Sequence, residues 1–92
     1  MLIEPAVERH LHDTSFKEGN ICTLSCQFSI PNAKSQWYRN GRPIKIGGRY
    51  STQVSDKVHK LIIKDVRTED QGQYTCKLDN LETTADLAIE GL

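Results

Sequence analysis

Apolar and polar residues alternate along most of this chain, with the period of two that is typical of β-strands buried on one face. The alternation is clearest in residues 21–28, 58–63 and 83–89. No segment of useful length shows the period of about 3.6 residues that marks an amphipathic helix. The pattern therefore predicts an all-β domain.

Turn-forming residues divide the chain into short strands. The predicted strands are residues 14–17, 21–28, 36–39, 50–54, 58–63, 73–78 and 83–89. Turns are expected at Asn40-Gly41 and Asp79-Asn80, because these residue types adopt a positive φ at low cost. A sheet edge tolerates the backbone donor that proline lacks, so an edge strand containing a proline is expected near the N-terminus. Its residues are Leu2, Ile3, Pro5 and Val7.

The length and charge of the chain limit what it can be. Its 92 residues match a sandwich of about 100 residues and are too few for two independent cores, so we expect one domain over residues 1–92. The 12 Lys and Arg balance the 12 Asp and Glu, which removes the electrostatic case for nucleic acid or an anionic membrane as a partner. No run approaches the ~18 apolar residues of a membrane span, and no apolar secretory signal opens the sequence.

Three landmarks have the spacing of an immunoglobulin-like domain. Trp37 follows Cys26 by 11 positions (37 − 26), and Cys76 follows Cys26 by 50 (76 − 26). Tyr74 stands two residues before Cys76, where a tyrosine corner bonds back to the upstream backbone. The spacing predicts an immunoglobulin-like Greek-key β-sandwich of two antiparallel sheets. Its expected core residues are Cys26, Trp37, Leu61, Tyr74 and Cys76.

Longer segments carry a more specific likeness. They are Lys17-Glu18-Gly19, Trp37-Tyr38-Arg39-Asn40-Gly41, Lys57-Val58-His59-Lys60-Leu61-Ile62-Ile63 and Thr68-Glu69-Asp70-Gln71-Gly72. These segments resemble the intermediate-set immunoglobulin domains of giant muscle proteins, the titin-like family. The last strand, residues 82–89, is similar to that of I-band domains in this family. The resemblance covers the whole chain.

This resemblance implies a structural and mechanical module, one of a tandem array in a much longer sarcomeric chain. Such a module bears passive tension and adds elasticity and scaffold length in striated muscle, in the cytoplasm at the I-band. The implied partners are neighbouring immunoglobulin domains of the same chain and sarcomeric proteins, with no cofactor, nucleic acid or membrane. The domain itself is expected to have no enzymatic activity, although a titin-like parent chain would carry a protein kinase domain elsewhere.

The resemblance also implies two arrangements of side chains. In similar domains an arginine that opens the fourth strand pairs with the acidic residue of the Asp-x-Gly-x-Tyr motif, which here implies a corner ion pair between Arg49 and Asp70. Similar domains place the segment at residues 14–17 parallel to the last strand, where tension would load the contact in shear. The expected residues of this mechanical clamp are Thr14, Phe16, Leu87 and Ile89.

The cysteines leave two chemical states open. A Cys26–Cys76 bridge at the cross-sheet position of the family would close a loop of about 50 residues and stabilise the fold by roughly 4 kcal/mol. The reducing cytosol of muscle favours two packed thiols beside Trp37 instead. Cys22 occupies an inward position and is expected to be an extra buried thiol that packs as a small hydrophobe. Competition between Cys22 and Cys26 for Cys76 would make the domain a redox-tuned spring.

The remaining polar residues suggest no catalytic or metal site. His10 and His12 stand two apart, as metal ligands can, but no third ligand is evident nearby. No nucleophile stands with a base, and no glycine-rich phosphate loop is present. The alternative function is protein recognition, by a sarcomeric docking module or a cell-surface adhesion receptor. A glycosylated ectodomain loses support because no Asn begins an Asn-x-Ser/Thr sequon.

Overall fold

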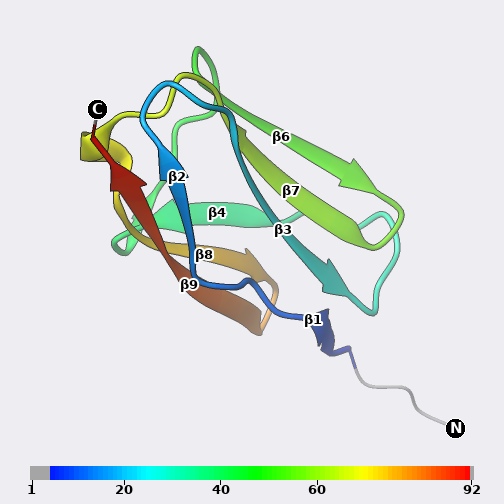
Figure 1. Ribbon diagram of the computed structural model, residues 1–92. Helices are drawn as coiled ribbons and strands as arrows, with labels where there is room; N and C mark the ends of the chain where they lie inside the picture. Colours follow the sequence, from blue (N-terminus) through cyan, green and yellow to red (C-terminus); the bar gives the residue numbers. More distant parts are fainter. Residues whose placement is uncertain (1–4, 92) are drawn as a thin grey trace, which may run out of the picture.

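In the computed structural model, which describes residues 5–91, two β-sheets pack face to face (Figure 1). The four-stranded sheet has the order β1-β3-β7-β6, formed by Val7–Arg9, Cys22–Phe28, Val58–Ile63 and Tyr50–Ser55. The five-stranded sheet has the order β2-β9-β8-β4-β5, formed by Thr14–Lys17, Leu81–Glu90, Gly72–Leu78, Gln36–Arg39 and Arg42–Pro43. A short 3₁₀ turn, η1, spans Thr68–Asp70 before β8. The predicted all-β, immunoglobulin-like sandwich is confirmed.

The first and last strands begin at residues that differ from the prediction. The first strand begins only at Val7, and Pro5 precedes it, while Leu2 and Ile3 lie outside the described residues. The alternation of apolar residues does not show where this segment pairs with another strand. In the structure its pairing with β3 begins at Val7, which lies opposite Phe28. The last strand begins earlier than predicted, because the tight turn after Leu78 allows pairing with β8 from the first residue, Leu81.

The chain crosses from one sheet to the other between β1 and β2, and a buried threonine holds this crossing. Thr83 on β9 is 2% exposed, and its Oγ1 accepts a hydrogen bond of 2.9 Å from the backbone N–H of Leu11. The same Oγ1 lies 3.0 Å from Nδ1 of His10. The crossing places β2 beside β9 in the same direction, which is the parallel placement that the resemblance implies for residues 14–17.

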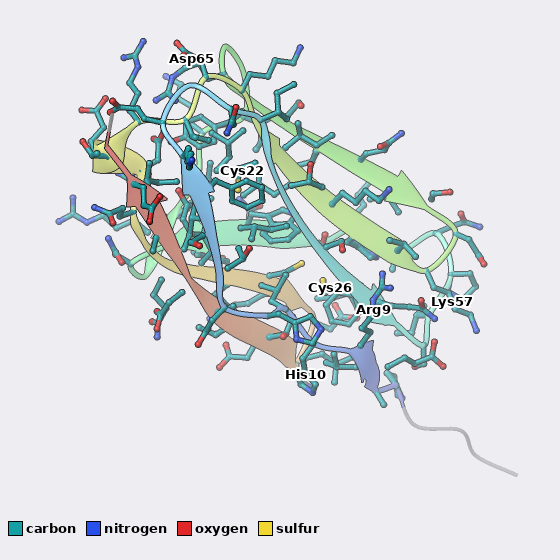
Figure 2. All side chains as sticks on the ribbon, in the orientation of Figure 1. Arg9, His10, Cys22, Cys26, Lys57 and Asp65 are labelled. Atoms are coloured by element: carbon teal, nitrogen blue, oxygen red, sulfur yellow. The ribbon has the colours of Figure 1, made fainter. Side chains whose placement is uncertain are left out.

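The core lies between the sheets, where alternate strand residues meet. Its buried apolar side chains are Leu11, Cys22, Leu24, Cys26, Phe28, Trp37, Leu61, Ile63, Val66, Tyr74, Cys76, Leu78, Ala85, Leu87 and Ile89. Trp37 lies directly opposite Cys76 in the β4–β8 ladder, at the short distance of a cross-strand pair. Figure 2 shows Cys22 and Cys26 along β3, and all three cysteines are buried free thiols.

One titratable side chain lies in this apolar interior. His59 on β7 is 0% exposed, and its Nδ1 lies 2.7 Å from Oγ of Ser35. Its ring meets the edge of Phe28 at a centroid distance of 5.1 Å, and its Nε2 has no hydrogen-bond partner among residues 5–91. Burial lowers the pKa of His59 below its usual 6.5, so the folded domain holds the neutral imidazole.

This burial predicts a loss of stability on mild acidification. The unfolded chain takes up a proton as the pH falls through 6.5, whereas the folded domain resists protonation of His59 until a lower pH. The free energy of unfolding should therefore decrease as the pH falls below 6.5. Urea titrations across this range should show a flatter profile for His59→Gln than for the wild type, while His12→Gln, at an exposed position, should keep the wild-type slope. Equal slopes for all three proteins would contradict the prediction.

Candidate functional site

The candidate load-bearing site is the parallel contact between β2 and β9. Four residue pairs are in register, among them Thr14 with Leu87 and Phe16 with Ile89. Hydrogen bonds extend the contact beyond both ends of the short strand. The backbone N–H of Glu18 donates to the carbonyl of Glu90 at 2.8 Å. At the other end, the N–H of Asp86 donates to Oδ1 of Asp13 at 2.9 Å.

The two edges of β9 serve different partners. The backbone groups of Asp86 and Glu90 face β2, as their hydrogen bonds show, whereas the N–H of Ile89 donates to the side chain of Gln71 at 3.1 Å. Backbone groups alternate in direction along a strand, so the N–H of Ala88 also faces β2. The buried side chains of Leu87 and Ile89 are 3% and 5% exposed, and half-buried Phe16 packs against the same core. This contact therefore joins backbone pairing to core packing.

A buried carboxylate organises the corner at the C-terminal end of β9. The side chain of Asp70 is 1% exposed. Arg49 donates to its two oxygens at 2.8 and 3.2 Å, and the hydroxyl of Tyr50 donates at 2.6 Å. The backbone N–H of Arg67 adds a hydrogen bond of 2.8 Å. The structure thus brings Arg49 and Asp70 together and adds two donors that sequence reasoning missed.

Each fixed residue of the Asp-x-Gly-x-Tyr motif has a role here. The hydroxyl of Tyr74, which is 0% exposed, donates to the carbonyl of Asp70 at 2.7 Å. Gly72 has a φ of +151°, and a Cβ at this position would lie 2.8 Å from Oδ1 of Asn40. That oxygen accepts a hydrogen bond of 2.9 Å from the N–H of Gln73. A side chain at position 72 would therefore displace the group that holds the start of β8.

The corner is bonded directly to the clamp. The N–H of Gly19, just after β2, donates to the carbonyl of Val66 at 2.8 Å, and Oε2 of Glu18 accepts from the N–H of Thr68 at 3.3 Å. Gln71 holds Ile89 on the other strand. Segment 66–71 is thus attached to both strands of the clamp, and it braces the end at which β9 leaves the sheet.

Ionisation of Asp70 is strongly favoured in the folded domain. Burial alone would raise the pKa of this carboxyl. The hydrogen bonds from Arg49, Tyr50 and the backbone of Arg67 outweigh burial and lower the pKa from 3.8 to about 2. The corner therefore contains a carboxylate at every physiological pH.

Two of the three thiols, those of Cys22 and Cys26, are held protonated in the fold. Burial, together with the negative charge of Asp70, raises the pKa of Cys22 to about 12. A hydrogen bond to the Cys76 thiol, and burial, raise the pKa of Cys26. Cys26 and Cys76 therefore lie in contact across the two sheets, whereas Cys22 stands four residues earlier on β3, ~13 Å along the strand. Hydrogen bonds with Cys26 and Ser35 lower the pKa of Cys76, although burial opposes them. The separation along β3 is too large for a bridge between Cys22 and Cys76.

The histidines near the N-terminus were the remaining candidate for a metal site. His10 contacts Thr83 at the sheet crossing. In the part of the chain that the structure describes, no three His, Cys, Asp or Glu side chains come together in a way that could hold a metal. No helix in residues 5–91 is long and apolar enough to cross a membrane.

The family follows from sequence comparison. A model of the immunoglobulin I-set domain matches residues 5–90. The chain belongs to the immunoglobulin I-set family. Crystallised domain I10 from titin superimposes on this I-set domain with a TM-score of 0.91 and 26% identity, covering 95% of this chain and 99% of the other.

Curated relatives include muscle proteins. Fast-type myosin-binding protein C of Gallus gallus is 33% identical over 69 residues, or 75% of this chain. Titin of Drosophila melanogaster is 28% identical over 87 residues, or 94% of it, and hemicentin-1 of Mus musculus is 38% identical over 79 residues, or 85%. This I-set domain spans 6%, 0% and 1% of the lengths of these three relatives, to the nearest per cent.

The Asp70 corner predicts a second loss of stability, at a lower pH than the one predicted for His59. Since the pKa of Asp70 is lower in the folded state than its reference of 3.8, its stabilising contribution is complete above that pH and is lost as the pH falls toward 2. The shift corresponds to about 2–3 kcal/mol. Asp70→Asn should lower the free energy of unfolding at neutral pH and flatten its decrease between pH 4 and 2.

A matched variant, Asp65→Asn, removes a carboxylate whose side chain is 67% exposed. It should retain the acid profile of the wild type in the same denaturant titrations. If the free energy of unfolding of Asp70→Asn fell with pH as steeply as that of the wild type, the corner carboxylate would not be the cause of the acid dependence.

Proposed function

We propose that this I-set domain is a mechanical module of a multidomain sarcomeric protein. It bears passive tension in striated muscle, in tandem with similar domains and at the I-band. The observation that carries the proposal is the parallel β2–β9 contact, braced by the Asp70 corner. The likeness to titin and myosin-binding protein C supports the muscle setting. The small share of each relative that the chain spans fits one module in a long array.

Tension would load this contact in shear. β1 lies at one end of the sandwich and the C-terminal end of β9 at the other (Figure 1). Since β2 and β9 are parallel neighbours, force applied toward these ends pulls the two strands past each other along their length. All hydrogen bonds between them then carry load together rather than opening one after another.

The contact of β1 with the four-stranded sheet is the weaker link in this path. Within residues 5–91, β1 meets β3 at two register positions with a shift between Val7 and Arg9, and the backbone of Ala6 adds hydrogen bonds to Ser29. By comparison, four consecutive pairs join β2 to β9, and the bonds of Glu18 and Asp86 extend them. We infer that β1 separates first and that the β2–β9 contact sets the force at which the domain unfolds.

Ala88→Pro should lower the unfolding force. The substitution removes a backbone donor that faces β2 and leaves its acceptor without a partner, which costs about 1–3 kcal/mol. Single-molecule pulling at constant velocity measures the effect directly. An unchanged force would contradict the role of the β2–β9 contact.

Val54→Pro provides the matched control. β6 is the edge of its sheet, and Tyr50 bonds through its backbone to Gly47, away from β7. Val54 is four residues after Tyr50 on the same strand, so its N–H points in the same direction, toward the open edge. Proline at position 54 therefore removes no hydrogen bond between β6 and β7. This variant should unfold near the wild-type force.

The Cys26–Cys76 contact predicts how oxidation changes the extension. Fully unravelled, 92 residues reach about 300 Å at roughly 3.3–3.6 Å per residue. A bridge would hide 50 of them (76 − 26), so the released length should fall by more than half. Pulling under oxidising and reducing conditions measures this length, and peptide mapping identifies the bridge. Equal lengths in the two conditions would exclude redox tuning of the spring.

A further inference from the structure

The zero net charge of this chain conceals a strong separation of charge along the sequence. Residues 34–64 contain eight Lys and Arg and one acidic residue, which gives a net charge of +7. The remaining residues contain four Lys and Arg and 11 Asp and Glu, which gives −7. Segregation on this scale produces an oriented field that neutral composition hides.

The topology converts this separation into two sides of the sandwich. The basic segment forms β4 and β5 at one edge of the five-stranded sheet, and β7 and β6 at one edge of the other. The opposite edges are β2, beside β9, and β1. One long side of the domain is therefore basic, and the side that carries the last strand is acidic.

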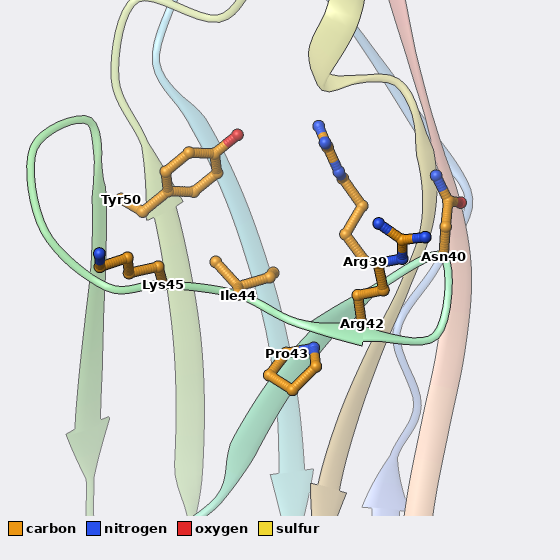
Figure 3. A pocket seen from close by; sticks show the side chains of 7 residues that line it. All are labelled: Arg39, Asn40, Arg42, Pro43, Ile44, Lys45 and Tyr50. Carbon is orange, nitrogen blue, oxygen red and sulfur yellow. The ribbon is translucent and has the colours of Figure 1, made fainter.

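The basic side contains an open pocket of about 570 Å³ (Figure 3). Arg39, Arg42 and Lys45 line it, together with the apolar side chains of Pro43 and Ile44. Among residues 5–91, neither Arg42 nor Lys45 forms an ion pair, and both are exposed. Arg39 pairs with Asp70 at 3.9 Å, so the unpaired cations of the pocket are Arg42 and Lys45, which line it together with Pro43 and Ile44.

The acidic side presents a row of carboxylates. Glu82, Asp86 and Glu90 occupy exposed, outward positions of β9 at intervals of four residues. Asp13 lies beside Asp86 and accepts a hydrogen bond from its backbone N–H. Only Glu82 of this row forms an ion pair within the described part of the chain, with Lys77 at 3.6 Å.

We propose that these two sides are complementary contact surfaces, and that the basic pocket of one copy docks against the β9 row of a second copy. The acidic surface that the pocket requires is present on the chain itself, and this self-complementarity identifies the partner. Because the two surfaces differ, the contact is heterologous and joins copies in series. It is weak at physiological salt, since exposed charges are screened within about 8 Å. A tandem array would raise the local concentration of similar domains to the millimolar range.

Charge reversal tests this pairing by sedimentation equilibrium. The wild type should associate at about 20 mM salt and at least tenfold more weakly at about 300 mM. Arg42→Glu with Lys45→Glu removes the basic surface, and Asp86→Lys with Glu90→Lys removes the acidic one. Each double variant alone should associate at least about tenfold more weakly than the wild type. An equimolar mixture of the two should regain association, because the reversed surfaces complement each other.

Lys34→Glu with Lys57→Glu controls for net charge. Lys57 lies beyond the end of β6 (Figure 2), whereas Tyr50 at the start of β6 lines the pocket (Figure 3). This variant has the same net charge as the pocket variant and should associate like the wild type. Equal weakening by both variants, a monomeric wild type at low salt, or a mixture that stays monomeric would each overturn the proposal. Binding of a hexaglutamate peptide to the pocket of a monomeric wild type would show instead that the partner is another acidic chain.

Discussion

The burial of one carboxylate, that of Asp70, is the constraint on which the rest of the structure depends. An ionised group removed from water costs several kcal/mol unless its lone pairs are satisfied. The donors that satisfy Asp70 come from the start of β6 in one sheet and from the backbone that leads to β8 in the other. Its own backbone carbonyl accepts from Tyr74 on β8. Both sheets are therefore held in fixed relation at the end where β9 leaves the domain.

This organisation supports the load-bearing role that we propose for a short strand. β2 contains only four residues, and such a strand would separate from its neighbour one bond at a time if its ends were free. Segment 66–71 fixes the end of β2 through Glu18 and Gly19 and contacts β9 through Gln71. At the opposite end, Asp13 and Thr83 hold the strand where it enters the sheet. Both ends are fixed, so the bonds between them would share load under the proposed tension.

The strands and the central core residues could be predicted from the sequence, because residue alternation and spacing encode them. Alternation located the strands because burial on one face imposes a period of two, and the spacing of Cys26, Trp37 and Cys76 placed three residues that meet in the core. It did not reveal the contacts of Tyr50 with Asp70 or of Thr83 with Leu11, which join distant positions through single polar groups. Such groups follow no period, and Ser35 beside the buried His59 was missed for the same reason. The bonding state of the cysteines depends on redox conditions as well as on geometry.

The placement of β2 beside β9 has a consequence for the time that the domain needs to recover after unfolding. Thr14 and Leu87 are neighbours in the fold but are separated by 73 positions (87 − 14) in the chain. The β6–β7 and β8–β9 hairpins, in contrast, close over a few residues. Loop-closure entropy favours formation of the local hairpins first, and the pairing of the two most distant strands last. In the proposed mechanical role, a relaxed chain would thus regain most of its β-structure before it regains resistance to force, and the interval between these events would be a separate property of the domain.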